Sequence, residues 1–179
     1  MIPTIGRIMA VIRKKDPSAR DIELLYETVR IAHQAKEKGN HPFGCLLADA
    51  QGNILLEGEN TVVTEHNDCG HSETNLMIAA SKMYSRDFLA TCSIYITAEP
   101  CVMCTGAIYW ANVRRIVVGM SERQLLEITG ADPENLTFDL PTHEILAHGQ
   151  KDFEIIGPVD DPKLNQAILA DHIGFWNKK

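Results

Sequence analysis

Two short stretches of this 179-residue chain combine residue types that bind metals and move protons. The first is His71-Ser72-Glu73, and the second is residues 100–104, with the sequence PCVMC. Cys101 and Cys104 are three residues apart, so on one turn of a helix their thiols lie on the same face. A lone C-x-x-C pair is ambiguous, because redox pairs and half zinc sites share this spacing. The upstream histidine favours a metal site.

Zinc is the metal that these ligand types fit best. It accepts cysteine and histidine readily, and three protein ligands leave a fourth position open for water. His71, Cys101 and Cys104 supply that set of three, which predicts one zinc ion per chain. A zinc ion held in this way lowers the pKa of a bound water to about 7. Glu73 is expected to act as the acid/base group beside that water rather than as a ligand.

A closed, purely structural zinc site is the alternative. It would need a fourth ligand, for which Cys69, His66 and His41 are the nearest candidates by type. Such a site would leave Glu73 without a role. The combined pattern H-x-E followed by P-C-x-x-C is the signature of zinc nucleobase deaminases. The pattern therefore favours an open, catalytic site.

Helices and strands that can position these residues alternate along the chain. Apolar periodicity predicts helices over residues 21–38, 72–84, 100–110, 121–128 and 161–176. Strands are expected over residues 43–48, 53–64, 93–98, 114–120 and 153–156. The first two strands form an antiparallel hairpin, and the strand–helix–strand order that follows implies parallel pairing with right-handed crossovers. We expect one domain over residues 1–179, a three-layer α/β/α sandwich around a mixed five-stranded sheet.

Composition excludes several classes of protein. The hydrophobic share of 45% and the charged share of 23% are typical of a globular protein and not of a disordered one. A net charge of −7 disfavours a long nucleic-acid footprint. No apolar run approaches the roughly 20 residues that span a bilayer, and Arg13-Lys14-Lys15 follows the first apolar residues, the reverse of a secretory signal. We expect a cytoplasmic protein with a small-molecule partner and no membrane.

Residues 42–122 resemble the cytidine-deaminase-like superfamily, in particular its branch of guanine deaminases and tRNA adenosine deaminases. The segments that carry the resemblance are HPFGCLL, EGEN, HSE and TAEPCVMCTGAIYWA. The form E-P-C-x-M-C is similar to the purine-acting branch, and GAIYWA is similar to guanine deaminases. The resemblance implies the sandwich fold predicted above, a zinc cofactor and a homodimer with composite active sites.

For the substrate pocket, the resemblance implies that Asn60 contacts the base. Its amide can both donate and accept hydrogen bonds, and a turn or capping role is the alternative. Phe43 and Trp110 are candidate walls for a flat ring, with core packing as the alternative for both.

Acidic residues and the C-terminal aromatics are further candidates. Glu99 resembles a family position beside the metal loop and could equally cap the helix that follows. Asp132 and Asp139 could each recognise a purine edge, or they could be solvated turn residues. Phe175 and Trp176 could close over the pocket or pack against the sheet.

The expected reaction is hydrolytic deamination of a free nucleobase or nucleoside, with guanine or a related aminopurine as the first choice. The alternatives are conversion of adenosine to inosine in tRNA and a cytosine or pterin deaminase. Two departures from the family concern the substrate: Ser72 stands where alanine is usual, and Gly130-Ala131-Asp132-Pro133 replaces a Phe-Asp-Asp-type segment. The tRNA editors end in an arginine-rich helix, whereas this chain has no arginine after Arg123.

Overall fold

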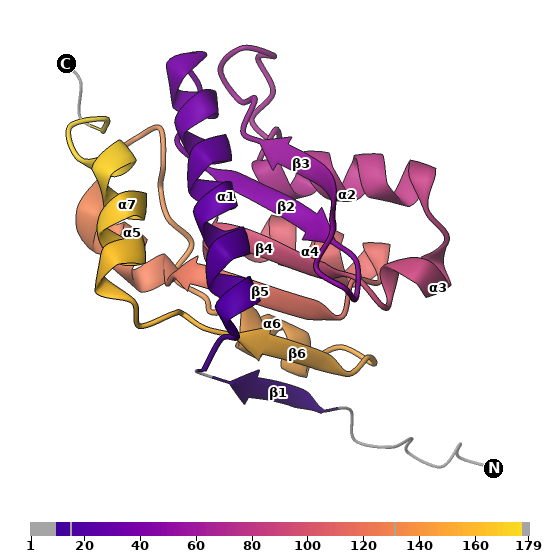
Figure 1. Cartoon of the computed structure of the whole chain (residues 1–179). Helices are drawn as coiled ribbons and strands as arrows, with labels where there is room; N and C mark the ends of the chain where they lie inside the picture. The colour runs from indigo at the N-terminus through magenta and orange to yellow at the C-terminus, as the bar shows by residue number, and fades with distance from the viewer. Residues whose placement is uncertain (1–9, 15, 131, 177–179) are drawn as a thin grey trace.

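In the computed structural model, a mixed sheet lies between two layers of helices (Figure 1), and residues 10–14, 16–130 and 132–176 are described. Expectations that concern residues 1–9, 15, 131 and 177–179 fall outside them. Within the described residues the strand order is β1-β6-β5-β4-β2-β3. The strands are β1 (Val11–Lys14), β2 (Gly44–Ala48), β3 (Ile54–Glu59), β4 (Ser93–Ala98), β5 (Arg115–Met120) and β6 (Phe153–Ile156).

The pairing confirms the expected mixture of antiparallel and parallel strands. β2 is antiparallel to both β3 and β4, whereas β4, β5, β6 and β1 run parallel to one another. The sheet has six strands rather than five, because Val11–Lys14 pairs with β6. This short strand is partly or fully exposed along its length, so it lacks the apolar alternation that predicts a strand.

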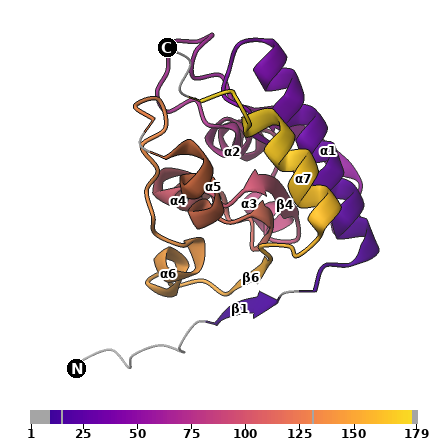
Figure 2. The same cartoon turned by 90° about the vertical axis from the view of Figure 1, so that its left-hand side faces the viewer.

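Helices cover both faces of the sheet, which confirms the three-layer sandwich. One layer holds α1 (Ala19–Glu37) and α7 (Pro162–His172), which lie side by side in both views (Figure 2). The other holds α2 (Ser72–Met83), α3 (Arg86–Leu89), α4 (Val102–Ala111) and α6 (Thr142–Ala147). α5 (Glu122–Thr129) follows β5 and packs Leu125 into the core beneath α1 and α7. No described helix has the length and the apolar character that crossing a bilayer requires.

Polar side chains explain where some predicted elements end early. The strand expected to reach Thr64 stops at Glu59, because two asparagine side chains bind the backbone that follows. Asn60 Oδ1 accepts a hydrogen bond from the Val62 N–H. Asn40 Oδ1 accepts hydrogen bonds from the N–H groups of Val63 and Thr64. These bonds fold residues 60–64 into turns instead of a ladder. The helix predicted from residue 100 begins at Val102, with Cys101 as its N-cap in an extended backbone conformation.

Gly58 allows β3 to approach the start of α2 closely. A Cβ atom at this position would lie 2.7 Å from the Ser72 carbonyl oxygen, 2.8 Å from Leu76 Cβ and 2.9 Å from Cys45 Sγ. These distances are shorter than carbon contacts permit, so the first turn of α2 would have to move. Because His71 and Glu73 flank Ser72, this close contact helps to position their side chains.

Replacing Gly58 with alanine is expected to destabilise the fold by about 1–3 kcal/mol, the usual result of overpacking. The matched control is Gly106→Ala in α4, where a new Cβ meets no atom within 4 Å. That control should be neutral or stabilising, because alanine favours a helix over glycine. Urea unfolding of both variants tests the difference, and equal midpoints would contradict it.

Candidate active site

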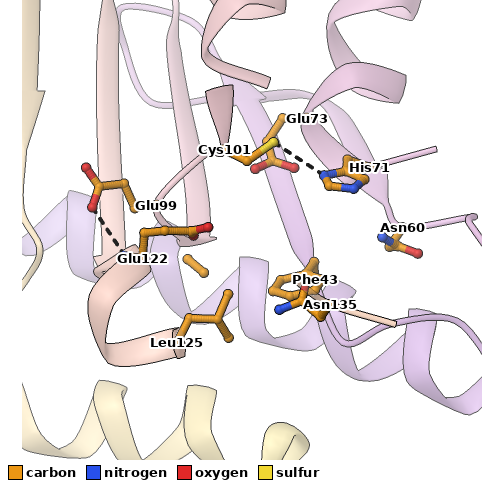
Figure 3. A pocket seen from close by; sticks show the side chains of 10 residues that line it. Phe43, Asn60, His71, Glu73, Glu99, Cys101, Glu122, Leu125 and Asn135 are labelled. Atoms are coloured by element: carbon orange, nitrogen blue, oxygen red, sulfur yellow. Dashed lines mark hydrogen bonds between the residues drawn. The ribbon is translucent and has the colours of Figure 1, made fainter. Parts of the chain in front are cut away.

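The residues predicted to bind a metal lie at the N-termini of two neighbouring helices. His71 is the N-cap of α2, and Cys101 is the N-cap of α4. Cys104 lies in the first turn of α4 and is fully buried. Because α2 and α4 pack against each other on one face of the sheet, their first turns bring the three side chains together (Figure 3 shows His71 and Cys101).

The spacing of the ligand atoms fits a zinc ion. The imidazole Nδ1 of His71 lies 3.7 Å from the Cys101 sulfur and 3.6 Å from the Cys104 sulfur. All three ligand atoms lie within 4.8 Å of one another. A tetrahedral zinc with bonds of about 2.3 Å to sulfur and 2.0–2.1 Å to nitrogen sets these atoms about 3.6 Å apart. The donor set therefore matches zinc in both chemistry and distance.

The surroundings of Cys101 favour the thiolate form that a metal requires, whereas the hydrogen bond with Cys101 and burial raise the pKa of Cys104. The pKa of Cys101 is lowered to about 4, because hydrogen bonds from Cys104 and His71 stabilise its thiolate. The partial positive charge of the α4 N-terminus acts in the same direction. Thr74 Oγ1 lies 3.4 Å from the Cys104 sulfur and can donate a hydrogen bond to it.

Glu73 lies beside the metal-binding group and is only 7% exposed. Burial raises the pKa of its carboxyl group. The Ser72 hydroxyl donates a hydrogen bond of 2.8 Å to Glu73 Oε2, so the serine that replaces the usual alanine holds the carboxyl group in place. A buried carboxyl group next to three metal ligands is suited to proton transfer.

A pocket opens onto this group, and it contains two of the residues predicted to bind substrate, Phe43 and Asn60 (Figure 3). A larger, more open hollow of about 660 Å³ shares Phe43, His71 and Asn135 with this pocket. The hollow thus forms an entrance to the pocket. The residues lining the inner pocket are Phe43, Asn60, His71, Glu73, Ala98, Glu99, Cys101, Glu122, Leu125 and Asn135.

Comparison with known families decides what kind of site this is. Residues 18–120 match the family model of the cytidine and deoxycytidylate deaminase zinc-binding region. The chain belongs to this family of zinc-dependent deaminases. The match spans His71, Glu73, Cys101 and Cys104, and the zinc cofactor and the enzymatic class predicted from the motifs are confirmed.

Individual relatives of this deaminase have different substrates in their names. The probable cytosine deaminase of Schizosaccharomyces pombe is 32% identical over 89% of this chain and 94% of its own length. The guanine deaminase of Bacillus subtilis is 37% identical over 42% of this chain and 47% of its own length. The solved structure of NE0047 in complex with 2,6-diaminopurine has the same fold, with a TM-score of 0.68, 23% identity, and coverage of 89% of this chain and 83% of that one.

Asn60 of the deaminase is fully buried at the pocket wall, and it has the turn role that was the alternative to contact with the base. Its Oδ1 atom accepts the 3.1 Å turn hydrogen bond from the Val62 N–H. Among the described residues its Nδ2 group has no hydrogen-bond partner. The side chain can thus offer a donor to a bound base, while its oxygen is already occupied within the turn.

Trp110, Asp132 and Asp139 do not line the metal pocket. Trp110 is 71% exposed, and its ring contacts Tyr109 and Lys151 instead. Asp132 is buried in the loop before α6, where its Oδ1 accepts a hydrogen bond from the Glu134 N–H. Asp139 forms a 2.7 Å ion pair with Arg123 beside a neighbouring cavity.

Glu99 acts as a cap, but of two helices other than the one predicted. Its Oε2 atom accepts a 3.2 Å hydrogen bond from the Glu122 N–H, at the start of α5. Its Oε1 atom accepts a 2.9 Å bond from the Thr142 N–H, at the start of α6. Through these two hydrogen bonds, Glu99 connects the end of β4, just before Cys101, to the first turns of both helices.

The C-terminal aromatic residues pack behind the pocket wall rather than closing over it. The Trp176 ring lies 6.0 Å from Phe43 and 5.2 Å from His41, measured between centroids. The helix predicted to reach this residue ends at His172, and Gly174, with a φ of +69°, lies in the turn that follows. Trp176 Nε1 donates a 3.1 Å hydrogen bond to Nδ1 of the buried His172.

This arrangement makes stability sensitive to acid. Burial lowers the pKa of His172 from 6.5 to about 4, so the unfolded chain takes up a proton at a higher pH than the folded protein does. The stabilisation is complete above pH 6.5 and is lost as the pH falls towards 4. The loss amounts to about 3 kcal/mol at 1.36 kcal/mol per pKa unit.

His172→Gln should flatten this part of the pH dependence relative to the parent and to the exposed-site control His66→Gln. Urea unfolding between pH 7 and pH 4.5 measures the three curves. Because acid-induced loss of zinc is common to all three proteins, the difference between curves isolates His172. If the free energy of unfolding of all three proteins falls with pH in the same way, His172 is not the source of the acid sensitivity.

Glu122, Leu125 and Asn135 line the pocket, but the sequence analysis did not single them out as functional. A signal for Glu122 existed. It is the first residue of the helix that follows β5, just as the metal-binding Cys101 precedes the helix that follows the parallel strand β4. Residues at the carboxyl ends of adjacent parallel strands share one edge of a sheet. Burial, followed by the Cys101 thiolate and Glu73, raises the pKa of Glu122 to about 8.

Proposed function

We propose that this deaminase replaces the exocyclic amine of a free nucleobase or nucleoside, guanine or a related aminopurine, with oxygen from water and releases ammonia. The observation that carries the proposal is the pocket shared by Glu73, two of the zinc ligands, the Phe43 ring and the Asn60 amide. A flat heterocycle needs an apolar face to pack against and a polar group at its edge. Phe43 and Asn60 offer these next to the reacting centre.

Each side chain has a distinct role in this reaction. Zinc, when bound, supplies a water that is acidic enough to lose its proton near neutral pH. Glu73 would accept that proton and transfer it to a ring nitrogen of the base, while the oxygen bonds to the ring carbon that bears the amine. Glu73 would then take the proton of this new hydroxyl group and give it to the amine, so that the C–N bond breaks, ammonia leaves and a carbonyl group remains. Asn60 donates a hydrogen bond from Nδ2 to the base, and Phe43 packs against the ring.

Two observations support a purine. The guanine deaminase of B. subtilis is 37% identical over 75 residues of this chain, and the solved structure of NE0047, which shares the fold, contains 2,6-diaminopurine. Cytosine is the second candidate, because the S. pombe relative is similar along nearly the whole chain.

A tRNA substrate is disfavoured by charge. The chain has a net charge of −7 and no arginine after Arg123, whereas binding to a phosphate backbone depends on clustered cations. The homodimer and the cytoplasmic location remain predictions.

Ammonia release from guanine, guanosine, adenine, cytosine, a pterin and tRNA tests the proposal. We expect kcat/KM for guanine or its nucleoside to exceed that for cytosine and adenosine compounds by about tenfold or more, because a mismatched base leaves a polar group of the site unpaired. A tenfold lead for cytosine would favour the second candidate. Tight binding of one tRNA, together with inosine formation in it, would contradict both the purine and the cytosine candidates.

A further inference from the structure

Glu122 is a second buried acid in the pocket, in addition to Glu73, the proposed proton-transfer group. It is the first residue of α5 and is 6% exposed. Figure 3 shows its side chain extending from α5 into the space bounded by Cys101, Glu73 and Phe43. The proton-transfer scheme above does not use it.

The carboxyl group of Glu122 differs from the other two acids of the pocket in its partners. Both oxygens of Glu99 accept backbone N–H groups, and Glu73 accepts the Ser72 hydroxyl. Glu122 accepts no hydrogen bond from any side chain or backbone group in the described parts of the chain. A base that fills the pocket displaces water from this carboxyl group, and a buried acceptor without a donor is costly. Although burial favours the neutral acid, the carbonyl oxygen of Glu122 is an acceptor in either protonation state. A bound molecule that offers a donor at this point satisfies that oxygen.

We propose that Glu122 accepts a hydrogen bond from a ring N–H of the bound base and thereby selects substrates that carry an N–H beside the reacting carbon. This inference rests on the proposed function and names the edge of the base that the site recognises. Guanine carries such a group, because its ring nitrogen N1 bears a hydrogen next to the carbon that holds the amine. In 2-aminopurine the same amine is present, but N1 is a bare acceptor. The two purines thus form a matched pair of probes.

The test compares kcat/KM for guanine and 2-aminopurine in the zinc-loaded parent, Glu122→Gln and Glu122→Leu. Leucine removes both acceptor oxygens, so it should lower kcat/KM for guanine by about 10–100-fold and leave 2-aminopurine within about threefold. Glutamine retains one acceptor oxygen and should fall between the parent and leucine. If 2-aminopurine turns over too slowly, its inhibition constant against guanine replaces kcat/KM.

Glu127→Gln is the matched control, because Glu127 is an exposed acid of the same helix, and it should leave both purines unchanged. Zinc content and melting temperature are measured for every variant. If Glu122 has only a structural role, its variants lose activity on both purines to the same extent, and that result would overturn the inference. The proposed function would still stand in that case, provided that the parent deaminates guanine. A parent that deaminates no purine would overturn both. If the leucine variant does not fold, an unchanged purine ratio in Glu122→Gln overturns the inference.

Discussion

Glu73→Gln is expected to retain zinc and to lose at least the 10²–10⁴-fold in kcat that is typical of a general acid/base. Glutamine has the same shape as glutamate but cannot accept and return a proton. The three zinc ligands do not include Glu73, so the metal should stay bound. Steady-state kinetics and elemental analysis of one preparation measure both quantities.

The control for this variant is Glu127→Gln, which removes an exposed carboxylate far from the proton path. It should match the parent in kcat and in zinc content. Turnover of Glu73→Gln within a few-fold of the parent would show that another group moves the proton. Loss of zinc would instead show that Glu73 supports the ligands.

Cys104→Ala is expected to lose most of the bound zinc and, with it, the activity. The remaining His71 and Cys101 provide only two ligands, whereas zinc sites of this kind use three. Because metal binding contributes to folding free energy, the melting temperature should fall as well. Elemental analysis after dialysis against a weak chelator gives the occupancy, which is expected to be about one ion per chain in the parent.

Cys69→Ala provides the matched control for the metal. Cys69 is an exposed free cysteine only two residues before His71, and it does not belong to the ligand group. Its removal should leave zinc occupancy unchanged, which also tests the closed four-ligand alternative. Full occupancy in Cys104→Ala would remove that cysteine from the ligand set.

The metal group could be predicted from the sequence because its geometry is local. Cys101 and Cys104 are three positions apart, and one helical turn converts that spacing into a shared face. His71 and Cys101 precede helices that follow the core strands, so the order of the elements brings them to one edge. Ser18 similarly marks the start of α1 through a capping box with Asp21.

Other features depend on contacts that local patterns do not encode. The fold adds that Trp110 remains 71% exposed, with its ring against Tyr109 and Lys151, whereas helical spacing indicates only that it lies about two and a half turns after Cys101 on the opposite side of α4. β1 exists through its pairing with β6, some 140 residues away in the chain. Asp132 is a buried acid like Glu122, but it lies in an irregular loop, and only the path of that loop places it outside the pocket.

The strand order implies a gradient of amide hydrogen exchange across the sheet. β1 forms its ladder with β6 alone, at the outer edge, whereas β4 is bonded on both sides, to β2 and β5. Edge amides exchange through local fraying, and central amides exchange only when the sheet opens as a whole. Because β4 leads directly into the loop that holds Cys101, protection should be greatest next to the zinc ligands and least in β1. The deaminase should therefore keep its metal through fluctuations that repeatedly release its N-terminal strand.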